Sequence, residues 1–227
     1  MTTITAPPDR DGLVLGERDL LVVENQGSAS HTVLNAGGRL DILNGGASDH
    51  TTVNSLGIEH VERGGSSSDT LIHRGGREVV DGGVSNSPRI MGGREFVESH
   101  GAVNDATIGD SGQLELFRGG HADNVTFADQ GRNSVLLDNP ANLHGTITNW
   151  RVGDYVDLIE TRNVSVSESG GVLTVNYDVR GEQRQATYTL ADQQADTHFV
   201  LRPDGHGGTD IMLAAGVQPH HHPDFLF

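Results

Sequence analysis

The segment GSASHTVLNAGGRLDILNGG, residues 27–46, contains two short runs of β-branched and aliphatic residues, each followed by a pair of glycines. The same arrangement recurs as far as residue 131, with turn glycines separated mostly by steps of 11 and 8 residues. These turn glycines are Gly27, Gly38, Gly46, Gly57, Gly65, Gly76, Gly83, Gly93, Gly101, Gly112, Gly120 and Gly131. Two turns therefore fall in each period of 19 residues, and a fixed period of this length is typical of stacked repeats.

Each half of the repeat has three to five residues with one or two apolar positions, which suits a short strand rather than a helix. Such strands bury an apolar face only when successive coils stack at ~4.8 Å. We expect two inner columns, with Val33, Val53 and Leu71 in one and Ile42, Val61 and Val79 in the other. The predicted fold class is all-β, a parallel β-solenoid of about six 19-residue coils followed by a smaller C-terminal β module.

The repeat pattern ends near Asn139-Pro140, after which longer alternating strands appear. We therefore expect four segments along the chain. They are an N-terminal cap over residues 1–21, β-solenoid repeats over residues 22–137, a C-terminal β module over residues 138–215 and a flexible tail over residues 216–227. Caps are expected because stacked strands otherwise leave open edges at both ends of the array.

The composition fits a thin core with many turns. Of 227 residues, 34% are hydrophobic and 4% are aromatic, while 31 are glycine. The net charge of -16 argues against nucleic acid and anionic membranes as partners. The lack of cysteine excludes disulfides and thiolate metal sites, and no apolar run is long enough for membrane insertion. The first residues show neither the basic nor the apolar region of a Sec signal peptide.

Two segments of the repeat region, Gly45–Val53 and Gly64–Leu71, resemble the AIDA-type repeat, also called the autotransporter passenger strand-loop-strand repeat. Its pattern is roughly G-G-x-A-x-x-T-x-V, followed by a second glycine turn and another strand. The resemblance covers about residues 20–137 and departs from the pattern around Pro88-Arg89. It implies a bacterial β-solenoid that is secreted or displayed on the cell surface and acts in adhesion, aggregation or biofilm formation.

Some members of this family are glycosylated on serine and threonine residues of the repeats. The resemblance therefore makes Ser66, Ser67, Ser68 and Thr70 candidate glycosylation sites. The alternative is a structural role, in which hydroxyl groups at the strand edges satisfy the amides of the turns.

The chain ends with an acidic residue and three bulky apolar residues, Asp224, Phe225, Leu226 and Phe227. This ending resembles the uncleaved signal of type I secretion substrates, which implies an ABC-type exporter as a partner. The acidic composition, the lack of cysteine and the missing N-terminal signal agree with that hypothesis. The alternative is an apolar end that is frayed or docked on the protein.

Two segments contain residue types that bind metal ions. Asp204 and Asp210 flank a glycine-rich turn and could bind calcium, although a plain β-turn is the favoured interpretation. His220, His221 and His222 could hold Zn²⁺ or Ni²⁺, although a solvated tail is favoured there. We therefore predict no cofactor, with calcium as the open alternative.

The sequence shows no nucleophile–base pair, phosphate loop or cofactor motif, which favours a protein that is not an enzyme. The acidic residues of the repeats look scattered rather than clustered for catalysis: Asp41, Glu59, Glu62, Glu78, Asp81, Glu95 and Glu98. Five arginines could form either a stripe that binds an anionic glycan or a solvated face of little energetic effect: Arg63, Arg74, Arg77, Arg94 and Arg118.

These observations predict a secreted bacterial surface or matrix protein that acts in adhesion, aggregation or biofilm formation through the extended surface of the solenoid. The expected partners are cell-surface or matrix glycans, or further copies of the chain. Two alternatives stay open. A carbohydrate-binding or carbohydrate-active β-helix would have a cleft with clustered carboxylates, and a self-assembling structural filament would associate through incomplete caps.

Overall fold

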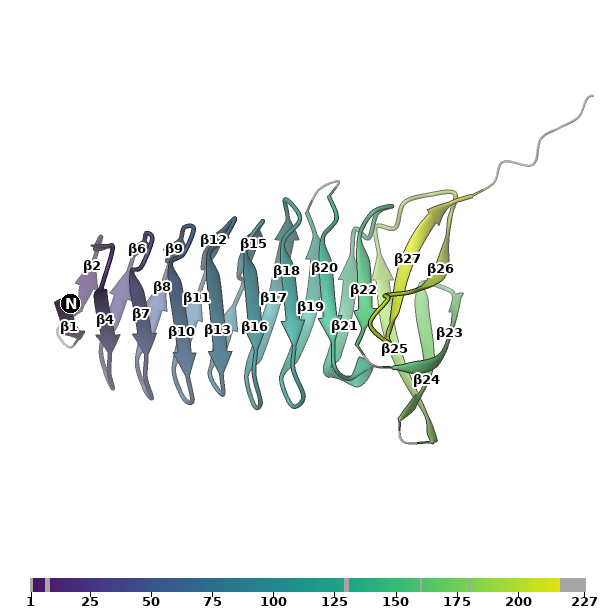
Figure 1. The fold of residues 1–227 in the computed structure, drawn as a ribbon, viewed down its shortest axis with the longest axis horizontal. Helices are drawn as coiled ribbons and strands as arrows, with labels where there is room; N and C mark the ends of the chain where they lie inside the picture. Colours follow the sequence, from purple (N-terminus) through teal and green to yellow (C-terminus); the bar gives the residue numbers. More distant parts are fainter. Residues whose placement is uncertain (1, 7–8, 129–130, 160, 180, 217–227) are drawn as a thin grey trace, which may run out of the picture.

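The structure, a computed structural model, describes residues 2–6, 9–128, 131–159, 161–179 and 181–216. These residues form an elongated rod of stacked β-coils, joined at one end to a group of longer C-terminal strands (Figure 1). Within the described ranges, the one helical element is a 3-10 turn over Pro140–Asn142. The prediction of an all-β parallel solenoid is confirmed, and the rod has about eight turns rather than six.

One face of the rod is a sheet of parallel strands, with one strand from each coil. In spatial order these strands are β1 (Thr2–Ala6), β4 (Asp19–Val23), β7 (Arg39–Ile42), β10 (Ile58–Glu62), β13 (Arg77–Asp81), β16 (Arg94–Val97), β18 (Gln113–Leu116), β20 (Ser134–Leu137) and β22 (Tyr155–Leu158). Residues one period apart are partners, so that Leu40 pairs with Leu21 on one side and with Glu59 on the other. The hydrogen bonds of the sheet therefore run along the axis of the rod.

The opposite face has two parallel ranks of shorter strands. The first rank contains β2 (Arg10–Asp11), β5 (Ser28–Ser30), β8 (Ala47–Asp49), β11 (Ser66–Ser68) and β14 (Val84–Asn86). The second rank contains β3 (Val14–Leu15), β6 (Val33–Leu34), β9 (Thr52–Val53), β12 (Leu71–His73) and β15 (Arg89–Met91). The strands β17 (Ala102–Gly109), β19 (His121–Phe127) and β21 (Leu143–Thr148) continue both ranks. A residue with positive φ, such as His31 or His50, forms the corner between the two ranks.

Parallel stacking extends beyond both ends of the segment expected for the solenoid. Residues 1–21, expected as a cap, already contribute β1, which pairs in parallel with β4. At the other end β20 pairs in parallel with β22, so stacking continues to Leu158 rather than ending at residue 137. The glycine pairs stop earlier because the 3-10 turn over Pro140–Asn142 reverses the chain without them.

One inner column differs by a residue from the expected one. Leu34, Val53 and Ile72 are partners in register and fully buried. Val33 and Leu71, expected in that column, lie on the outward side of their strands instead. These strands are too short to show a long alternation of apolar and polar residues, so the sequence does not tell which residue of each strand points inward. Because neighbouring side chains of a strand point to opposite faces, a shift of one residue exchanges the inner and the outer side.

The facing column shows the same one-residue shift at a single position. Ile42 and Val61 are buried as expected, but the next member is Val80 and not Val79. The reason is that Glu78 and Val80 share the inner side of β13, which leaves Val79 on the outer side. A buried carboxyl group therefore sets the register of this strand.

In the turns that contain two glycines, the two have different tasks. Gly45 has a φ of 74°, in the left-handed region that glycine adopts without strain. A Cβ on Gly46 would lie 2.4 Å from the carbonyl oxygen of Val23 in the preceding coil. Ten periodic glycines, from Gly38 to Gly120, are of this second kind, with a backbone carbonyl oxygen less than 3 Å from the position of a Cβ. The period of the glycines therefore reports the close approach of successive coils.

The C-terminal strands continue both faces and cover the end of the core. The strands β23 (Arg162–Ser169), β24 (Val172–Val179) and β25 (Glu182–Ala191) form an antiparallel sheet, whose last strand pairs in parallel with β21. The hairpin of β26 (Thr197–Pro203) and β27 (Thr209–Ala215) pairs antiparallel with β22. Trp150 is fully buried between Phe127 and Phe199, at ring-centre distances of 5.9 and 5.2 Å. The module therefore closes the apolar interior at this end.

Tyr188 joins this module to the last turn of the rod. The residue is fully buried, and its hydroxyl group donates a hydrogen bond of 2.8 Å to the carbonyl oxygen of Pro140. We expect Tyr188→Phe to lower the free energy of unfolding by about 1 to 2 kcal/mol, because the buried carbonyl loses its partner. Urea unfolding followed by circular dichroism measures the change. The half-buried Tyr155 supplies the control Tyr155→Phe, which should leave stability unchanged, and an unchanged Tyr188→Phe would contradict the prediction.

Candidate functional site

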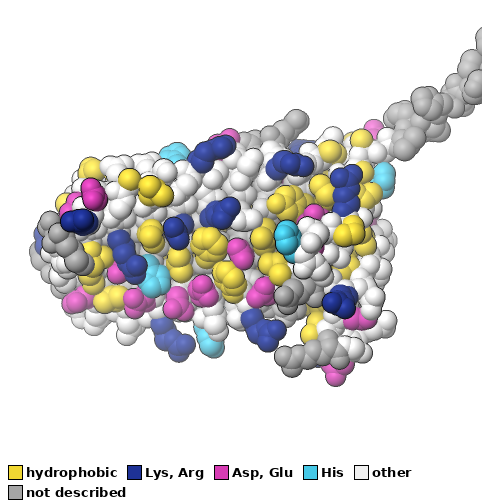
Figure 2. Space-filling model, in the orientation of Figure 1, with side chains coloured by type: hydrophobic (Ala, Val, Ile, Leu, Met, Phe, Trp, Pro, Cys, Tyr) yellow, Lys and Arg dark blue, Asp and Glu magenta, His cyan; other side chains and the backbone are white. Residues whose placement is uncertain are grey.

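The outer face of the first sheet presents ranks of side chains that run along the rod. One rank passes through Ile58, Arg77, Arg94 and Gln113, and the next passes through His60, Val79, Phe96 and Glu115. Figure 2 shows this face, on which basic, acidic and apolar side chains lie side by side. An extended surface of this kind is what solenoids use to contact large partners.

Three of the five arginines expected in a stripe come together on this face. Arg74, Arg77 and Arg94 line one groove. Arg63 lies at a different turn, between β10 and β11, and Arg118 lies beyond β18 near the C-terminal module. The register of the coils explains the grouping, because it makes Arg77 and Arg94 direct neighbours.

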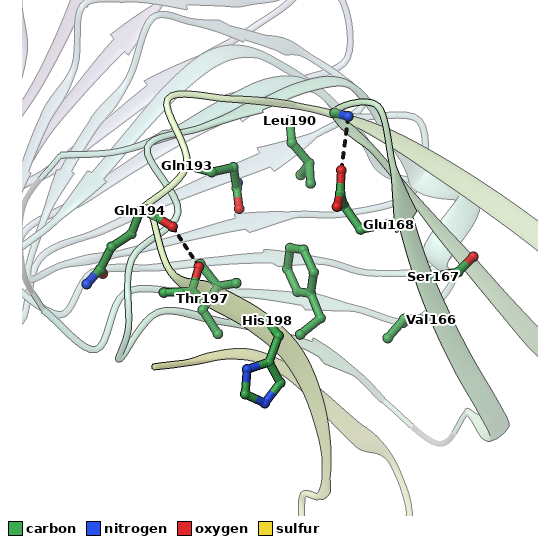
Figure 3. A pocket seen from close by; sticks show the side chains of 11 residues that line it. Val166, Ser167, Glu168, Leu190, Gln193, Gln194, Thr197 and His198 are labelled. Carbon is green, nitrogen blue, oxygen red and sulfur yellow. Dashed lines mark hydrogen bonds between the residues drawn. The ribbon is translucent and has the colours of Figure 1, made fainter. Parts of the chain in front are cut away.

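A cavity of about 510 Å³ lies between the antiparallel sheet and the hairpin of the C-terminal module (Figure 3). The carboxylate of Glu168 enters it and accepts a hydrogen bond of 3.0 Å from the backbone amide of Gly171. The ring of Phe199 and the imidazole of His198 also line this space. The cavity therefore combines one acid, one imidazole and an aromatic surface.

This cavity shows no arrangement that activates a nucleophile. The hydroxyl group of Ser167 points away from His198 (Figure 3). Among the residues that the structure describes, no hydrogen bond joins His198 to an acid, as a catalytic base would need. That the chain is not an enzyme stays a prediction.

The two aspartates considered for calcium lie together with a third acid. Asp210 on β27 pairs with Asp157 on β22, and the turn that contains Asp204 precedes β27. One oxygen of Asp204 accepts hydrogen bonds from the backbone amides of residues 206–208, which lowers the pKa of that carboxyl group. Burial, reinforced by Asp210 and Asp204, raises the pKa of Asp157 to about 6. The turn interpretation thus accounts for Asp204, and calcium binding stays a prediction.

A second acidic group escaped the sequence analysis. Asp49, His50 and Asp69 are exposed, and one potential ligand atom from each lies within 4.8 Å of the others. The imidazole of His50 donates a hydrogen bond to the carboxylate of Asp49, which raises the pKa of His50, and its ring stacks on that of His31 at 5.2 Å. The signal was the 19-residue step from His50 to Asp69, which places them in neighbouring coils.

The structure separates the four candidate glycosylation sites into two pairs. Ser67 and Thr70 are fully buried, and their hydroxyl groups donate hydrogen bonds of 2.6 and 2.9 Å to buried glutamates. This corrects the expectation for both residues, because the folded chain does not present them to an enzyme. Ser66 and Ser68 lie on the other side of β11 and are partly exposed. Ser67 and Thr70 thus have a structural role, but their hydroxyl groups donate to buried carboxyl groups rather than satisfying the amides of the turns.

Three of the glutamates that looked scattered in the sequence occupy the core. Glu59, Glu78 and Glu95 are fully buried and adjacent in register, and the same column continues into Leu40 and Leu114. Burial raises the pKa of all three, that of Glu95 to about 8. The interior of the rod therefore holds carboxyl groups that resist ionisation.

The hydroxyl groups that face this column become fewer along the rod. Glu59 accepts hydrogen bonds of 2.7, 3.0 and 2.9 Å from Ser48, Thr51 and Thr70. Glu78 accepts one, of 2.6 Å, from Ser67. Among the described residues, Glu95 accepts none with normal geometry, although the Ser85 hydroxyl lies close enough to lower the pKa of both Glu78 and Glu95.

The sequence change at Pro88 explains this loss of partners. In the register of the coils, Thr70 follows Thr51, and Pro88 and Ala106 take the next two places. Neither replacement has a hydroxyl group to donate. The departure from the repeat pattern at Pro88 therefore leaves one oxygen of Glu78 unpaired within the described part of the chain.

Two candidate sites lie outside the described residues. They are the secretion signal at Asp224, Phe225, Leu226 and Phe227 and the histidines His220, His221 and His222.

Part of the rod matches a known family of proteins. Residues 22–76 match the family described as "Adhesin of bacterial autotransporter system, probable stalk". The match supports repeats of the AIDA type and an adhesin-like surface protein.

Among solved structures, a similar chain is the "TibC-catalyzed hyper-glycosylated TibA55-350 fragment", which is 20% identical to this protein. The alignment covers 67% of this chain and 80% of that one, with a TM-score of 0.32. No curated protein matches the sequence. None of the described segments forms an apolar helix of membrane-spanning length.

Proposed function

We propose that this chain is an adhesin-like protein, secreted or displayed at the bacterial surface, which binds through the outer faces of the rod and is not an enzyme. The observation that carries the proposal is the match of residues 22–76 to the adhesin stalk family. The unbroken parallel ranks along the rod support it, because they offer a long, regular surface rather than an enclosed substrate site.

The closed C-terminal end argues against growth of a filament by end-to-end stacking. A rod that stacks on a copy of itself needs an open parallel edge at both ends. Here the last parallel strand of the first sheet, β22, is already paired with β27. The adhesion role is therefore favoured over the filament alternative.

Cells that display residues 1–227 on a heterologous surface anchor are expected to sediment faster and to retain more biomass on glycan-coated surfaces. The control is the same cell displaying an unrelated globular protein on the same anchor, at a surface density matched by antibody binding. Sedimentation rate and retained biomass are the two readouts. Equal values for both cell types, with the chain detected at the surface, would contradict an adhesive role.

Three finer elements belong to the same proposal. Biofilm formation would be the cellular outcome, Ser66 and Ser68 would be the repeat serines open to glycosylation, and the terminal residues Asp224–Phe227 would direct export through an ABC-type exporter. The exposure of the two serines supports the second element, and the sequence pattern alone supports the third.

A further inference from the structure

A groove of about 390 Å³ lies on the outer face of the rod, between the turn that follows β12 and the strand β16. Arg74 enters it from that turn, Arg77 from the start of β13 and Arg94 from the start of β16. Three arginines therefore line one hollow on a chain whose net charge is -16.

These three arginines have no acidic partner of their own. In the described part of the chain, the arginines that form ion pairs are Arg18, Arg39 and Arg184. The acid that interacts with the groove is Glu115 in the neighbouring coil. Its pKa is raised, mainly by burial, and the positive charge of Arg94 opposes part of this rise. The positive charge of the groove is therefore left largely uncompensated.

The register makes this arrangement costly without an anion. Arg77 and Arg94 are direct partners on neighbouring parallel strands, about 4.8 Å apart along the rod. Like charges placed opposite each other on a sheet repel, and an anion between them removes that repulsion. The planar fork of a guanidinium group also matches the oxygens of a carboxylate or a sulfate, which two arginines can hold together.

The other walls of the groove suit a sugar ring. Phe96 lies two residues after Arg94 on the same side of β16, and its ring stacks with that of Phe117 at 6.3 Å. Glycines at positions 75, 76 and 92 line the remaining surface, so that no side chain fills the hollow. An aromatic wall beside a cationic one accommodates an apolar sugar face next to a charged substituent.

We infer that this groove binds an anionic saccharide, with its carboxylate or sulfate group between Arg77 and Arg94, near Arg74, and a ring face against Phe96. The inference rests on the proposed adhesive function and gives it a ligand class. Uronic acids and sulfated sugars share the required chemistry, and they are distinguished by the test.

The test is isothermal titration calorimetry of the full chain with three hexasaccharides: an oligogalacturonate, a heparin fragment and the neutral maltohexaose. We expect binding of at least one anionic oligosaccharide, weaker at higher salt, and none of the neutral one. The double variant Arg77→Gln/Arg94→Gln should weaken binding by about tenfold or more. The matched control Arg18→Gln/Arg39→Gln removes the same charge from two ion-paired arginines and should bind like the parent.

The outcomes distinguish uronic acids from sulfated sugars as ligands, and they distinguish the saccharide site from the proposed adhesive function. Binding of the uronate alone or the sulfate alone identifies the source of the anion, and binding of both supports the shared chemistry. Equal binding of neutral and anionic oligosaccharides, no binding at all, or unchanged binding by Arg77→Gln/Arg94→Gln would overturn the inference. Displayed cells that adhere although the chain binds no anionic saccharide would leave the adhesive function standing without this site. Binding without adhesion would leave the site and remove the function.

Discussion

On moving from pH 4 to pH 9, the free energy of unfolding is expected to fall by roughly 5 kcal/mol through Glu95 alone. Burial raises the pKa of Glu95 from 4.5 to about 8. Below pH 4.5 its carboxyl group is protonated in the folded and the unfolded chain. Between pH 4.5 and 8 only the folded chain keeps the proton, so rising pH favours unfolding, and above pH 8 the loss is complete. Glu78, whose pKa is raised well above its ordinary value, acts in the same direction.

The variant Glu95→Gln isolates this effect because it removes the ionisation and keeps the shape of the side chain. We expect it to match the parent closely at pH 4 and to exceed its stability by roughly 5 kcal/mol at pH 9. The exposed Glu24 supplies the control Glu24→Gln, which should follow the parent at every pH. Urea unfolding followed by circular dichroism at several pH values measures all three. Parallel curves for the parent and Glu95→Gln would show that Glu95 is not a buried, protonated acid.

The second large effect is expected where neighbouring coils touch. In Gly46→Ala the new Cβ would lie 2.4 Å from the carbonyl oxygen and 3.0 Å from the carbonyl carbon of Val23. Backbone atoms cannot rotate out of the way as a side chain can, so the two coils must separate locally. We expect a loss of about 3 kcal/mol in the free energy of unfolding, measured by denaturant titration.

Gly16 provides the matched control for this substitution. A Cβ at Gly16 would have no heavy atom within 4 Å, and its φ lies outside the left-handed region. Gly16→Ala should therefore change stability by less than about 0.5 kcal/mol. If Gly46→Ala were as harmless as Gly16→Ala, the spacing of the coils would be wider than the structure has it.

The period of the glycines was sufficient to predict the stacked coils. Close contact between coils demands glycine at each turn whatever side chains lie between, so the spacing survives in the sequence. The register of individual strands was not predictable in the same way. Strands of two residues, such as Val33–Leu34, carry apolar side chains on both faces, and no alternation tells the inner from the outer one.

The buried glutamates were hidden by the same ambiguity. Glu59 and Glu78 are 19 residues apart and Glu95 follows after 17, a spacing that fits a rank on the outside as well as one on the inside. The hydroxyl groups that face Glu59 come from β8 and from residues just before β9 and β12, eight or eleven residues away, in two neighbouring coils. Only the assembled cross-section brings them together.

The groove was predictable in part. Arg77 and Arg94 directly follow the turn glycines Gly76 and Gly93, so they could be placed in neighbouring coils from the sequence. The approach of Arg74 could not, because it depends on how the turn after β12 folds against β16. Nor did the sequence indicate that Arg63 and Arg118 would lie apart from the other three.

The threonine column has a consequence for how such a rod changes length. Before Pro88, successive coils share glycine at the turns and threonine facing the interior at Thr32, Thr51 and Thr70. Duplication of one 19-residue unit there by unequal recombination would add a coil of about 4.8 Å and keep the pattern of side chains intact. Duplication across Pro88 would instead copy a carboxyl group that lacks a hydroxyl partner. We therefore expect the rod to tolerate an added coil better among its first coils than in its middle.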